Sequence, residues 1–217
     1  MELSSPQLSA ERFLQSASST AMIEVFEIKG GVLEYIDETH TYLYDGVVLP
    51  SITQVLKVKF GGKYDGIPKA TLERAADLGS AVHRAIEDFE KQGIECDLPE
   101  LRNWKFLKKK YEFVCLNNEV PVVLFQDDEP IACGRLDLVL GENGVIGLGD
   151  IKRTATLDKN YLAYQLNLYR IAYQQCYDTD ISFLRGVHLR NDVRKYITLP
   201  INENLAKEVI NQYYKGE

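Results

Sequence analysis

Residues 134–152 read GRLDLVLGENGVIGLGDIK, and this stretch decides the fold that we expect for the chain. Its apolar residues favour two strands, over 131–140 and 145–152, and the Gly-Glu-Asn-Gly between them is typical of a hairpin loop. If all four residues form the loop, Leu140 faces Val145 across an antiparallel pair.

This register brings three charged side chains together. It places Asp137 opposite Leu148, and residues that are opposed or two apart on a strand project from the same face. Asp137, Asp150 and Lys152 therefore share one face of the sheet. A loop that differs by one residue would break this arrangement, because it would turn one strand over.

Two carboxylates and one ammonium on a half-buried face are costly without partners. A divalent cation relieves the repulsion between the carboxylates, and oxygen ligands favour Mg²⁺ or Mn²⁺ over Zn²⁺. A lysine beside such a site can orient a water molecule and stabilise charge on a phosphate. These parts suit metal-assisted phosphodiester hydrolysis, although Asp-x-Lys alone is common by chance and is more typical of a surface strand with a salt bridge.

A helix expected over 68–92 adds further candidates. His83 and Glu87 are four residues apart and lie on one helix face. His83 can offer an imidazole to the cation, and Glu87 can offer a carboxylate to a second cation or to the groups around the first. Gly79 falls on the same stripe, where a missing side chain allows another element to approach closely. The plainer interpretation of His83 is a hydrogen-bonded histidine at a helix–sheet contact.

The rest of the chain shows an α+β order without repeats or linkers. Ser51 and Gln54 form a capping-box pattern, which predicts a helix that begins at Ile52. Residues 1–22 are expected to form a loose arm and 23–217 a single domain. The other expected elements are strands over 23–29, 32–36, 41–44, 47–49, 120–125, 182–190 and 194–199, helices over 99–117, 157–176 and 203–214, and a loop over 57–67.

Composition excludes several classes of protein. The chain has 217 residues, of which 45% are hydrophobic and 26% charged, so it is neither collagen-like nor disordered. No two of the four cysteines have the spacing Cys-x-x-Cys, and we expect all four to be reduced thiols. The sequence shows no secretory signal and no apolar run of membrane-spanning length, so we expect a soluble, cytoplasmic protein.

The net charge of −7 argues at first against a nucleic-acid partner, but its distribution does not. Residues 57–74, 102–111 and 184–196 together carry +11, which leaves −18 on the remainder. Aromatic residues are interleaved with these cations, as in grooves that bind single strands or frayed ends. For 102–111 a solvated helix face explains the charge equally well, so we favour the 57–67 loop as the element that grips DNA.

The ordered set of motifs resembles the PD-(D/E)xK nucleases, and within them the RecB-like and phage exonuclease branch. The mitochondrial genome maintenance exonucleases share this plan. The resemblance covers roughly residues 32–199. It is carried by His83, Gly134-Arg135-Leu136-Asp137, Asp150-Ile151-Lys152 and Gln165-Leu166-Asn167-Leu168-Tyr169, with His40-Thr41-Tyr42, Asp45-Gly46 and Leu49-Pro50-Ser51-Ile52-Thr53 upstream.

The resemblance implies a restriction-endonuclease-like core, with a central mixed, mostly antiparallel sheet flanked by helices. It implies that His83, Asp137, Asp150 and the Ile151 main-chain carbonyl bind Mg²⁺ or Mn²⁺ and that Lys152 is catalytic. Glu87 is an addition to this ligand set that the family does not supply. Gln165 and Tyr169 would contact DNA or support the site. The other expected DNA contacts are Thr154, Ser51, Thr53, Lys57, Lys59 and Lys63, while solvation is the simple explanation for Arg153.

The implied activity is a DNA exonuclease of phage-type recombination, repair or replication, in the cytoplasm of a bacterial or phage-infected cell. The partners would be a single strand or duplex end, a single-strand annealing protein and further copies of the chain. Some relatives hold an iron–sulfur cluster with four cysteines, three of them late in the chain. Here only Cys176 follows Tyr169, so we expect no cluster. The alternatives are a site-specific or structure-specific endonuclease and a non-catalytic DNA-binding or inhibitor protein on a nuclease scaffold.

Overall fold

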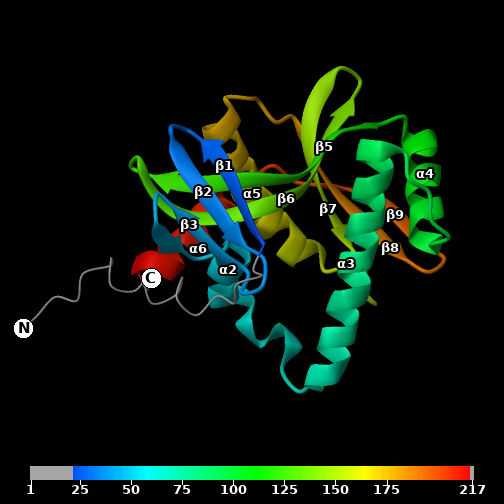
Figure 1. The fold of residues 1–217 in the computed structure, drawn as a ribbon, viewed down its shortest axis with the longest axis horizontal. Coiled ribbons are helices and arrows are strands. Elements are labelled where there is room, and N and C mark those ends of the chain that lie inside the picture. The colour runs from blue at the N-terminus through cyan, green and yellow to red at the C-terminus, as the bar shows by residue number, and fades with distance from the viewer. Residues whose placement is uncertain (1–21, 216–217) are drawn as a thin grey trace, which may run out of the picture.

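The computed structural model describes residues 22–215 as an α+β fold with two sheets and flanking helices (Figure 1). The strands are β1 (Ile23–Ile28), β2 (Gly31–Ile36), β3 (Thr41–Tyr44), β4 (Val47–Leu49), β5 (Val114–Gln126), β6 (Glu129–Glu142), β7 (Val145–Lys152), β8 (Phe183–Arg190) and β9 (Val193–Leu199). The helices are α2 (Ile52–Phe60), α3 (Lys69–Gln92), α4 (Pro99–Tyr111), α5 (Lys159–Tyr177) and α6 (Glu203–Lys215), with a 3-10 turn at Gly61–Tyr64.

The central sheet has the strand order β5-β6-β7-β8-β9. All neighbouring pairs are antiparallel except β7 and β8, which run parallel because α5 provides the crossover between them. The expectation of a mixed, mostly antiparallel sheet flanked by helices is thereby confirmed.

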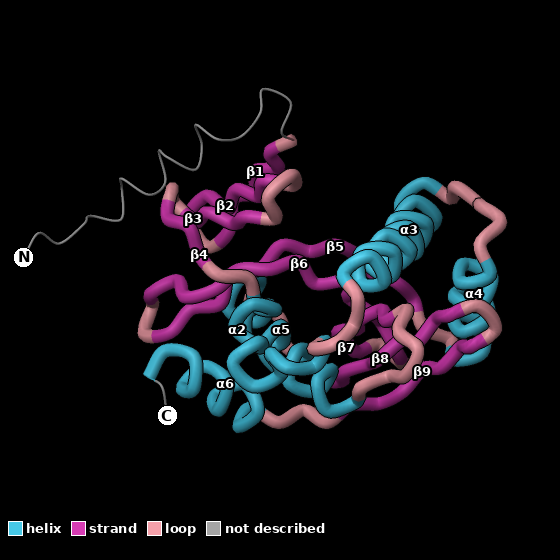
Figure 2. Tube along the Cα trace, turned by 90° about the horizontal axis from the view of Figure 1, so that it is seen from below, coloured by secondary structure: helices cyan, strands magenta, loops and turns pink. Residues whose placement is uncertain are grey.

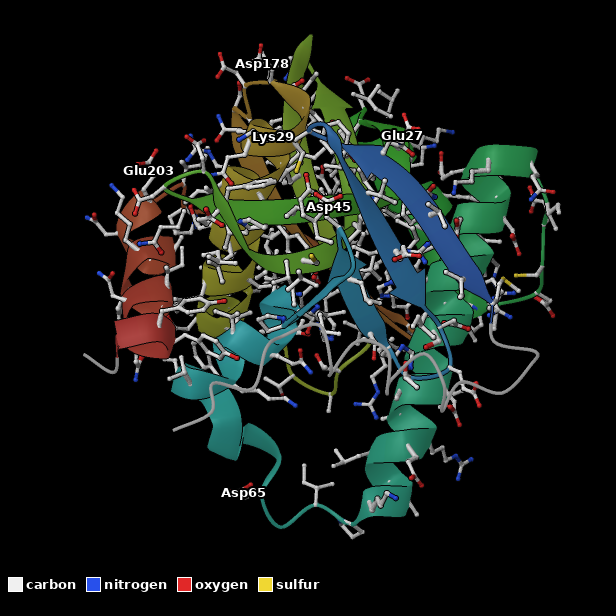
Figure 3. The ribbon with its side chains drawn as sticks, turned by 60° about the vertical axis from the view of Figure 1, so that its left-hand side comes forward. Glu27, Lys29, Asp45, Asp65, Asp178 and Glu203 are labelled. Carbon is white, nitrogen blue, oxygen red and sulfur yellow. The ribbon has the colours of Figure 1, made fainter. Side chains whose placement is uncertain are left out.

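Strands β1 to β4 form a second, fully antiparallel sheet rather than an extension of the first. In Figure 2 it lies over β5 and β6. Its tyrosine-rich inner face packs on Val123, Phe125 and Cys133 of those strands. In Figure 3, Lys29 and Asp45 mark the turns at one end of this sheet, while Asp65 marks the segment that projects between α2 and α3.

Helices cover both faces of the central sheet. α2, α5 and α6 pack on one face in a large apolar cluster that includes Leu136 and Leu148. α3 and α4 pack on the other face, with Trp104 fully buried against Leu138, Leu140 and their neighbours. The catalytic candidates of β6 and β7 therefore lie between two helical layers. None of the helices in residues 22–215 is both long and apolar enough to cross a membrane.

Local signals set several boundaries as expected. The Ser51 hydroxyl accepts a hydrogen bond from Gln54 N–H, and the Gln54 side chain accepts one from Ser51 N–H, which completes the capping box of α2. Gly93 ends α3 in the left-handed conformation with φ of 68°.

The predicted register of the β6–β7 hairpin is wrong by two residues. Leu140 pairs with Gly147, not Val145, because Gly141 and Glu142 belong to β6. The turn consists of Asn143 and Gly144 alone, whose φ angles of 49° and 80° suit a two-residue hairpin. An even shift leaves every side chain on its predicted face.

Two other predicted boundaries are wrong. The helix expected over 99–117 ends at Tyr111, because Glu112 adopts the left-handed conformation and β5 begins at Val114. The loop expected over 57–67 is partly helical, since α2 continues to Phe60. The arm predicted over 1–22 lies outside the described residues except for Met22, and a single domain over 23–217 stays a prediction.

Candidate metal centre

The candidate site lies where the ladder between β6 and β7 ends. Their last pair is Leu138 with Gly149, and continuing this register places Asp137 level with Asp150. The Asp137 side chain extends the connection between the strands, because its Oδ2 accepts a hydrogen bond from Ile151 N–H at 2.7 Å. This point, where β6 and β7 separate, is the strand opening, and it places the Asp137 carboxylate against the Ile151 peptide.

α3 delivers His83 to this opening. Its Nε2 lies 3.2 Å from the Ile151 carbonyl oxygen and 3.7 Å from Asp137 Oδ2. The imidazole, the Asp137 carboxylate and the Ile151 carbonyl, all named from sequence, thus converge from α3, β6 and β7. The sequence separation between His83 and Ile151 is 68 residues, so packing alone brings them together.

Glu119 of β5 joins the cluster and was missed by sequence reasoning. Its Oε1 lies 3.4 Å from His83 Nδ1, and ligand atoms of His83, Glu119 and Asp137 all lie within 4.8 Å of one another. The β5–β6 ladder pairs Asn118 with Leu138 and Val120 with Leu136, so Glu119 is level with Asp137. Glu119 has φ of 51°, a conformation that is strained for a residue with a side chain. The only sequence signal was the polar Asn-Asn-Glu at 117–119, just before the predicted strand.

Lys152 and Asp150 form a close ion pair beside this cluster. The Nζ of Lys152 lies 2.5 Å from Asp150 Oδ2, and the side chains are 24% and 2% exposed. Burial, together with the Asp137 charge, raises the pKa of Asp150 to about 6. Burial alone would lower the pKa of Lys152, but the carboxylates of Asp150 and Asp137 outweigh it and raise that pKa. Lys152 is therefore a cation at neutral pH.

The acids around His83 also control its protonation. Burial alone would lower its pKa, but Asp137 and Glu119 raise the pKa of His83 to about 9. Burial raises the pKa of Asp137, although His83 and Lys152 act in the opposite direction. Without a cation, His83 is thus protonated at neutral pH and shares its charge with both carboxylates.

Gln165 and Tyr169 lie beneath the site on α5 instead of on the surface, since each is 5% exposed. Gln165 Oε1 is buried and accepts no hydrogen bond from the described residues. A Cβ on Gly134 would lie 2.9 Å from the Tyr169 hydroxyl, so glycine is what lets the ring lie against β6. Tyr169 therefore packs against β6, and both side chains are buried, while contact of either residue with DNA stays a prediction.

Glu87 and Gly79 are not brought to the cluster. The Glu87 carboxylate is paired with Lys91 at 2.6 Å, one turn further along α3. A Cβ added at Gly79 would meet nothing within 4 Å, so the expected close approach at this glycine is wrong.

Four of the eight expected DNA contacts have polar partners within the described residues. Ser51 caps α2 and its hydroxyl contacts that of Thr53 at 2.9 Å. Lys59 pairs with Glu208 of α6 at 2.5 Å, while Lys57 is exposed on α2. The Thr154 hydroxyl donates to the Thr156 carbonyl. Lys63 lies in the 3-10 turn, and its side chain is outside the described part of the chain.

Arg153 is mostly buried and paired, so simple solvation does not describe it. Its Nε donates to Oε1 of the buried Glu100 at 2.9 Å, which ties the segment after Lys152 to α4. The basic run on α4 is likewise largely paired: Lys105 with Glu95, Lys108 with Glu90 and Arg102 with Asp97.

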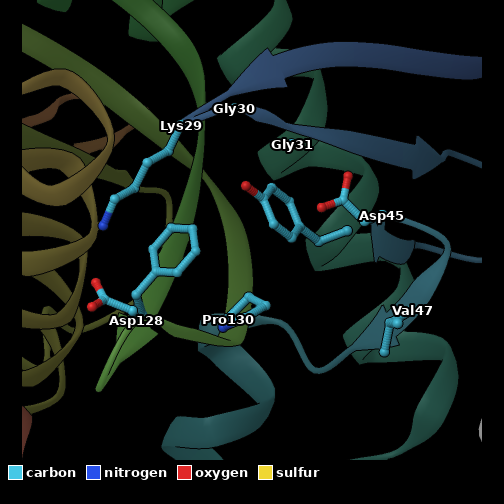
Figure 4. Close-up of a pocket in the computed structure, with 9 residues that line it drawn as sticks. Lys29, Gly30, Gly31, Asp45, Val47, Asp128 and Pro130 are labelled. Atoms are coloured by element: carbon cyan, nitrogen blue, oxygen red, sulfur yellow. The ribbon is translucent and has the colours of Figure 1, made fainter.

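A pocket of about 380 Å³ is lined by residues of the second sheet and of the β5–β6 hairpin (Figure 4). Its charges are engaged locally, since Asp45 accepts from Val32 N–H at 2.8 Å and Lys29 Nζ lies 4.4 Å above the Phe125 ring. It contains none of the site residues. The lining residues are Lys29, Gly30, Gly31, Tyr44, Asp45, Val47, Phe125, Asp128 and Pro130.

The donor set suits a hard divalent cation. It offers the carboxylates of Glu119 and Asp137, the Ile151 carbonyl and one imidazole, so oxygen atoms predominate. The predicted ligand Asp150 is not part of this group, because its Oδ2 is paired with Lys152. Oxygen-rich sets of this kind favour Mg²⁺ or Mn²⁺, and Mn²⁺ accepts an imidazole more readily. A cation would also neutralise carboxylates that burial and mutual repulsion otherwise penalise.

Comparisons with known proteins do not assign this chain to a family. No family model and no curated protein matches the sequence. One similar solved structure is the crystal structure of SSO0001, with 12% sequence identity and a TM-score of 0.44. The match covers 97% of this chain and 83% of the SSO0001 chain. A likeness this distant carries no argument, so the function rests on the residues of the site.

Proposed function

We propose that this protein is a Mg²⁺- or Mn²⁺-dependent deoxyribonuclease with a PD-(D/E)xK core, acting as an exonuclease in DNA recombination, repair or replication. The observation that carries the proposal is the meeting of His83, Asp137 and the Ile151 carbonyl at one strand opening. Lys152 follows that carbonyl directly. The β6–β7 hairpin and the distant helix α3 would together supply the parts that phosphodiester hydrolysis requires.

Each residue has a definite part in the proposed reaction. His83, Asp137, Glu119 and Asp150 would hold the cation, with the Ile151 carbonyl beside them. The bound cation would supply Lewis-acid polarisation of the phosphate and a more acidic water. Lys152 is protonated, so it acts as a charge that orients the water and stabilises the phosphate, and does not act as a base.

Digestion of end-labelled DNA tests the proposal. Purified protein should degrade the DNA with Mg²⁺ or Mn²⁺ and not with a chelator. Asp150→Ala and Lys152→Ala should abolish cleavage while circular dichroism shows a retained fold, and Glu87→Gln should cleave like the parent. Full activity in either of the first two variants would overturn the assignment.

A matched pair of substrates separates the two nuclease classes. An exonuclease should degrade linear DNA and leave the same molecule intact when it is covalently closed. Cleavage of the closed form would favour the endonuclease alternative. DNA binding without cleavage under every metal condition would favour the non-catalytic alternative.

A further inference from the structure

Arg135 connects the candidate metal centre to the second sheet. It lies on β6 two residues before Asp137, and its Nη1 is 2.7 Å from Glu24 Oε1 on β1. Its guanidinium also lies 5.5 Å from the centre of the Tyr35 ring on β2. The Arg135 guanidinium is thus held at the border between the two sheets, next to the acidic cluster.

The hydrogen bonding of Arg135 is incomplete on the side that faces the cluster. Its Nε lies 3.5 Å from Glu119 Oε2, and this buried atom donates no hydrogen bond to the described residues. In contrast, the Nε atoms of Arg153 and Arg185 donate to carboxylates at 2.9 and 2.8 Å. An unpaired buried donor is costly, and this one lies beside a proposed substrate site.

Glu119 divides its carboxylate between Arg135 and the metal cluster. Oε2 faces Arg135, while Oε1 faces His83. A divalent cation held by Glu119 would compete for the charge that now attracts Arg135. The guanidinium would then keep Glu24 as the partner of Nη1 but lose the attraction of Glu119 at Nε, and its other donors have the planar geometry that binds phosphate oxygens well.

We infer that Arg135 is a phosphate-binding residue that becomes available when the metal centre is filled. Its ligand would be a backbone phosphate of the bound DNA strand, next to the phosphate at the cation. This inference rests on the proposed function. It adds that affinity for DNA is coupled to the metal through the shared Glu119 carboxylate.

DNA-binding measurements in a Lys152→Ala background test the inference without cleavage. The probe is a fluorescein-labelled single strand, titrated with Mn²⁺ or with a chelator. Arg135→Gln should weaken binding about tenfold or more with Mn²⁺, as expected for the loss of a charged hydrogen bond, and change it little with the chelator. The slope of log affinity against log salt should fall by about 1 with Mn²⁺ only.

Glu24→Gln is the matched control for a purely structural role. It removes the negative charge that Arg135 pairs with on β1 but leaves Arg135 and Glu119 in place, so it should bind DNA at least as tightly as the parent. If Glu24→Gln weakens DNA binding as much as Arg135→Gln, Arg135 is only a strap between the sheets and the inference is wrong. The inference is also wrong if Arg135→Gln lowers Mn²⁺ affinity in the absence of DNA.

These outcomes are separable from the proposed function. Cleavage by the parent with unchanged DNA binding by Arg135→Gln overturns the inference alone. Absence of cleavage, with Mn²⁺-dependent DNA binding that Arg135→Gln abolishes, overturns the nuclease proposal and supports the role of Arg135.

Discussion

Lys152 and Asp150 hold each other in an ion pair with 2.5 Å between Nζ and Oδ2, and the carboxylate is almost completely buried. Their alternation on β7 directs both side chains toward the α5 side of the sheet. The pair therefore presents a fixed positive charge next to the opening at Asp137, and its stability depends on the protonation of Asp150.

Lys152→Ala should lower the free energy of unfolding by about 2–3 kcal/mol at pH 8, because it leaves an uncompensated buried carboxylate. The loss should be smaller at pH 5. Asp150 has a pKa of about 6 in the folded protein and is then protonated. Urea denaturation at both pH values measures this, with the exposed Lys109 replaced by alanine as the control. An equal loss at both pH values would contradict the role assigned to Asp150.

Glu119→Gln should weaken Mn²⁺ binding about tenfold or more, since it removes a carboxylate that contacts His83. Glu87→Gln removes the same charge from α3 at a position paired with Lys91, and it should bind Mn²⁺ like the parent. Isothermal titration of metal-free protein compares the two variants. Equal losses would mean that overall charge, and not the geometry of the cluster, determines the affinity.

The backbone at Glu119 gives a separate prediction about stability. Glycine adopts positive φ without penalty, so Glu119→Gly should be about 1 kcal/mol more stable than Glu119→Ala. Both variants lack the carboxylate, so the comparison sets the relief of strain at positive φ against the greater entropy of glycine in the unfolded chain. Thermal unfolding without metal measures the difference, and a less stable glycine variant would show that φ at this position is not strained.

Mn²⁺ affinity should rise about tenfold per pH unit between pH 7 and 9. His83 has a pKa of about 9 in the metal-free protein and must release its proton before it can bind a cation. Below that pKa, each unit by which the pH falls therefore weakens Mn²⁺ binding, because more of the His83 side chain is protonated. Metal titrations across this range test the slope, and His83→Asn should flatten it. A slope that persists in this variant would assign the proton to another group.

Gly134→Ala should lower the free energy of unfolding by about 1–3 kcal/mol, because the added methyl group meets the buried Tyr169 ring. Gly79→Ala adds the same methyl group in the interior of α3, where it meets nothing, and should raise stability by about 0.5–1 kcal/mol. Urea denaturation measures both variants. Changes of opposite sign in the free energy of unfolding would establish that only Gly134 is closely packed. A neutral Gly134→Ala would mean that Tyr169 can move aside.

Features that depend on adjacent residues were predicted well from sequence. The capping box at Ser51, the end of α3 at Gly93 and the strands of the second sheet follow from side chains within a few positions of each other. The hairpin register was predicted wrongly from a four-residue loop, although Asn143-Gly144 carries the signal of a two-residue turn. The helix over 99–117 was extended too far because the apolar spacing continues past Glu112, where the backbone turns.

The sequence by itself determined the face that Asp150 and Lys152 share, because the alternation of a strand is a property of the covalent backbone. Only the tertiary structure decided which acid His83 meets. Glu87 lies on the same helix but pairs with Lys91, while Glu119, on β5, reaches the imidazole. Packing of α3 on the sheet made that choice, since contacts between residues far apart in the chain depend on how whole elements bury their apolar faces.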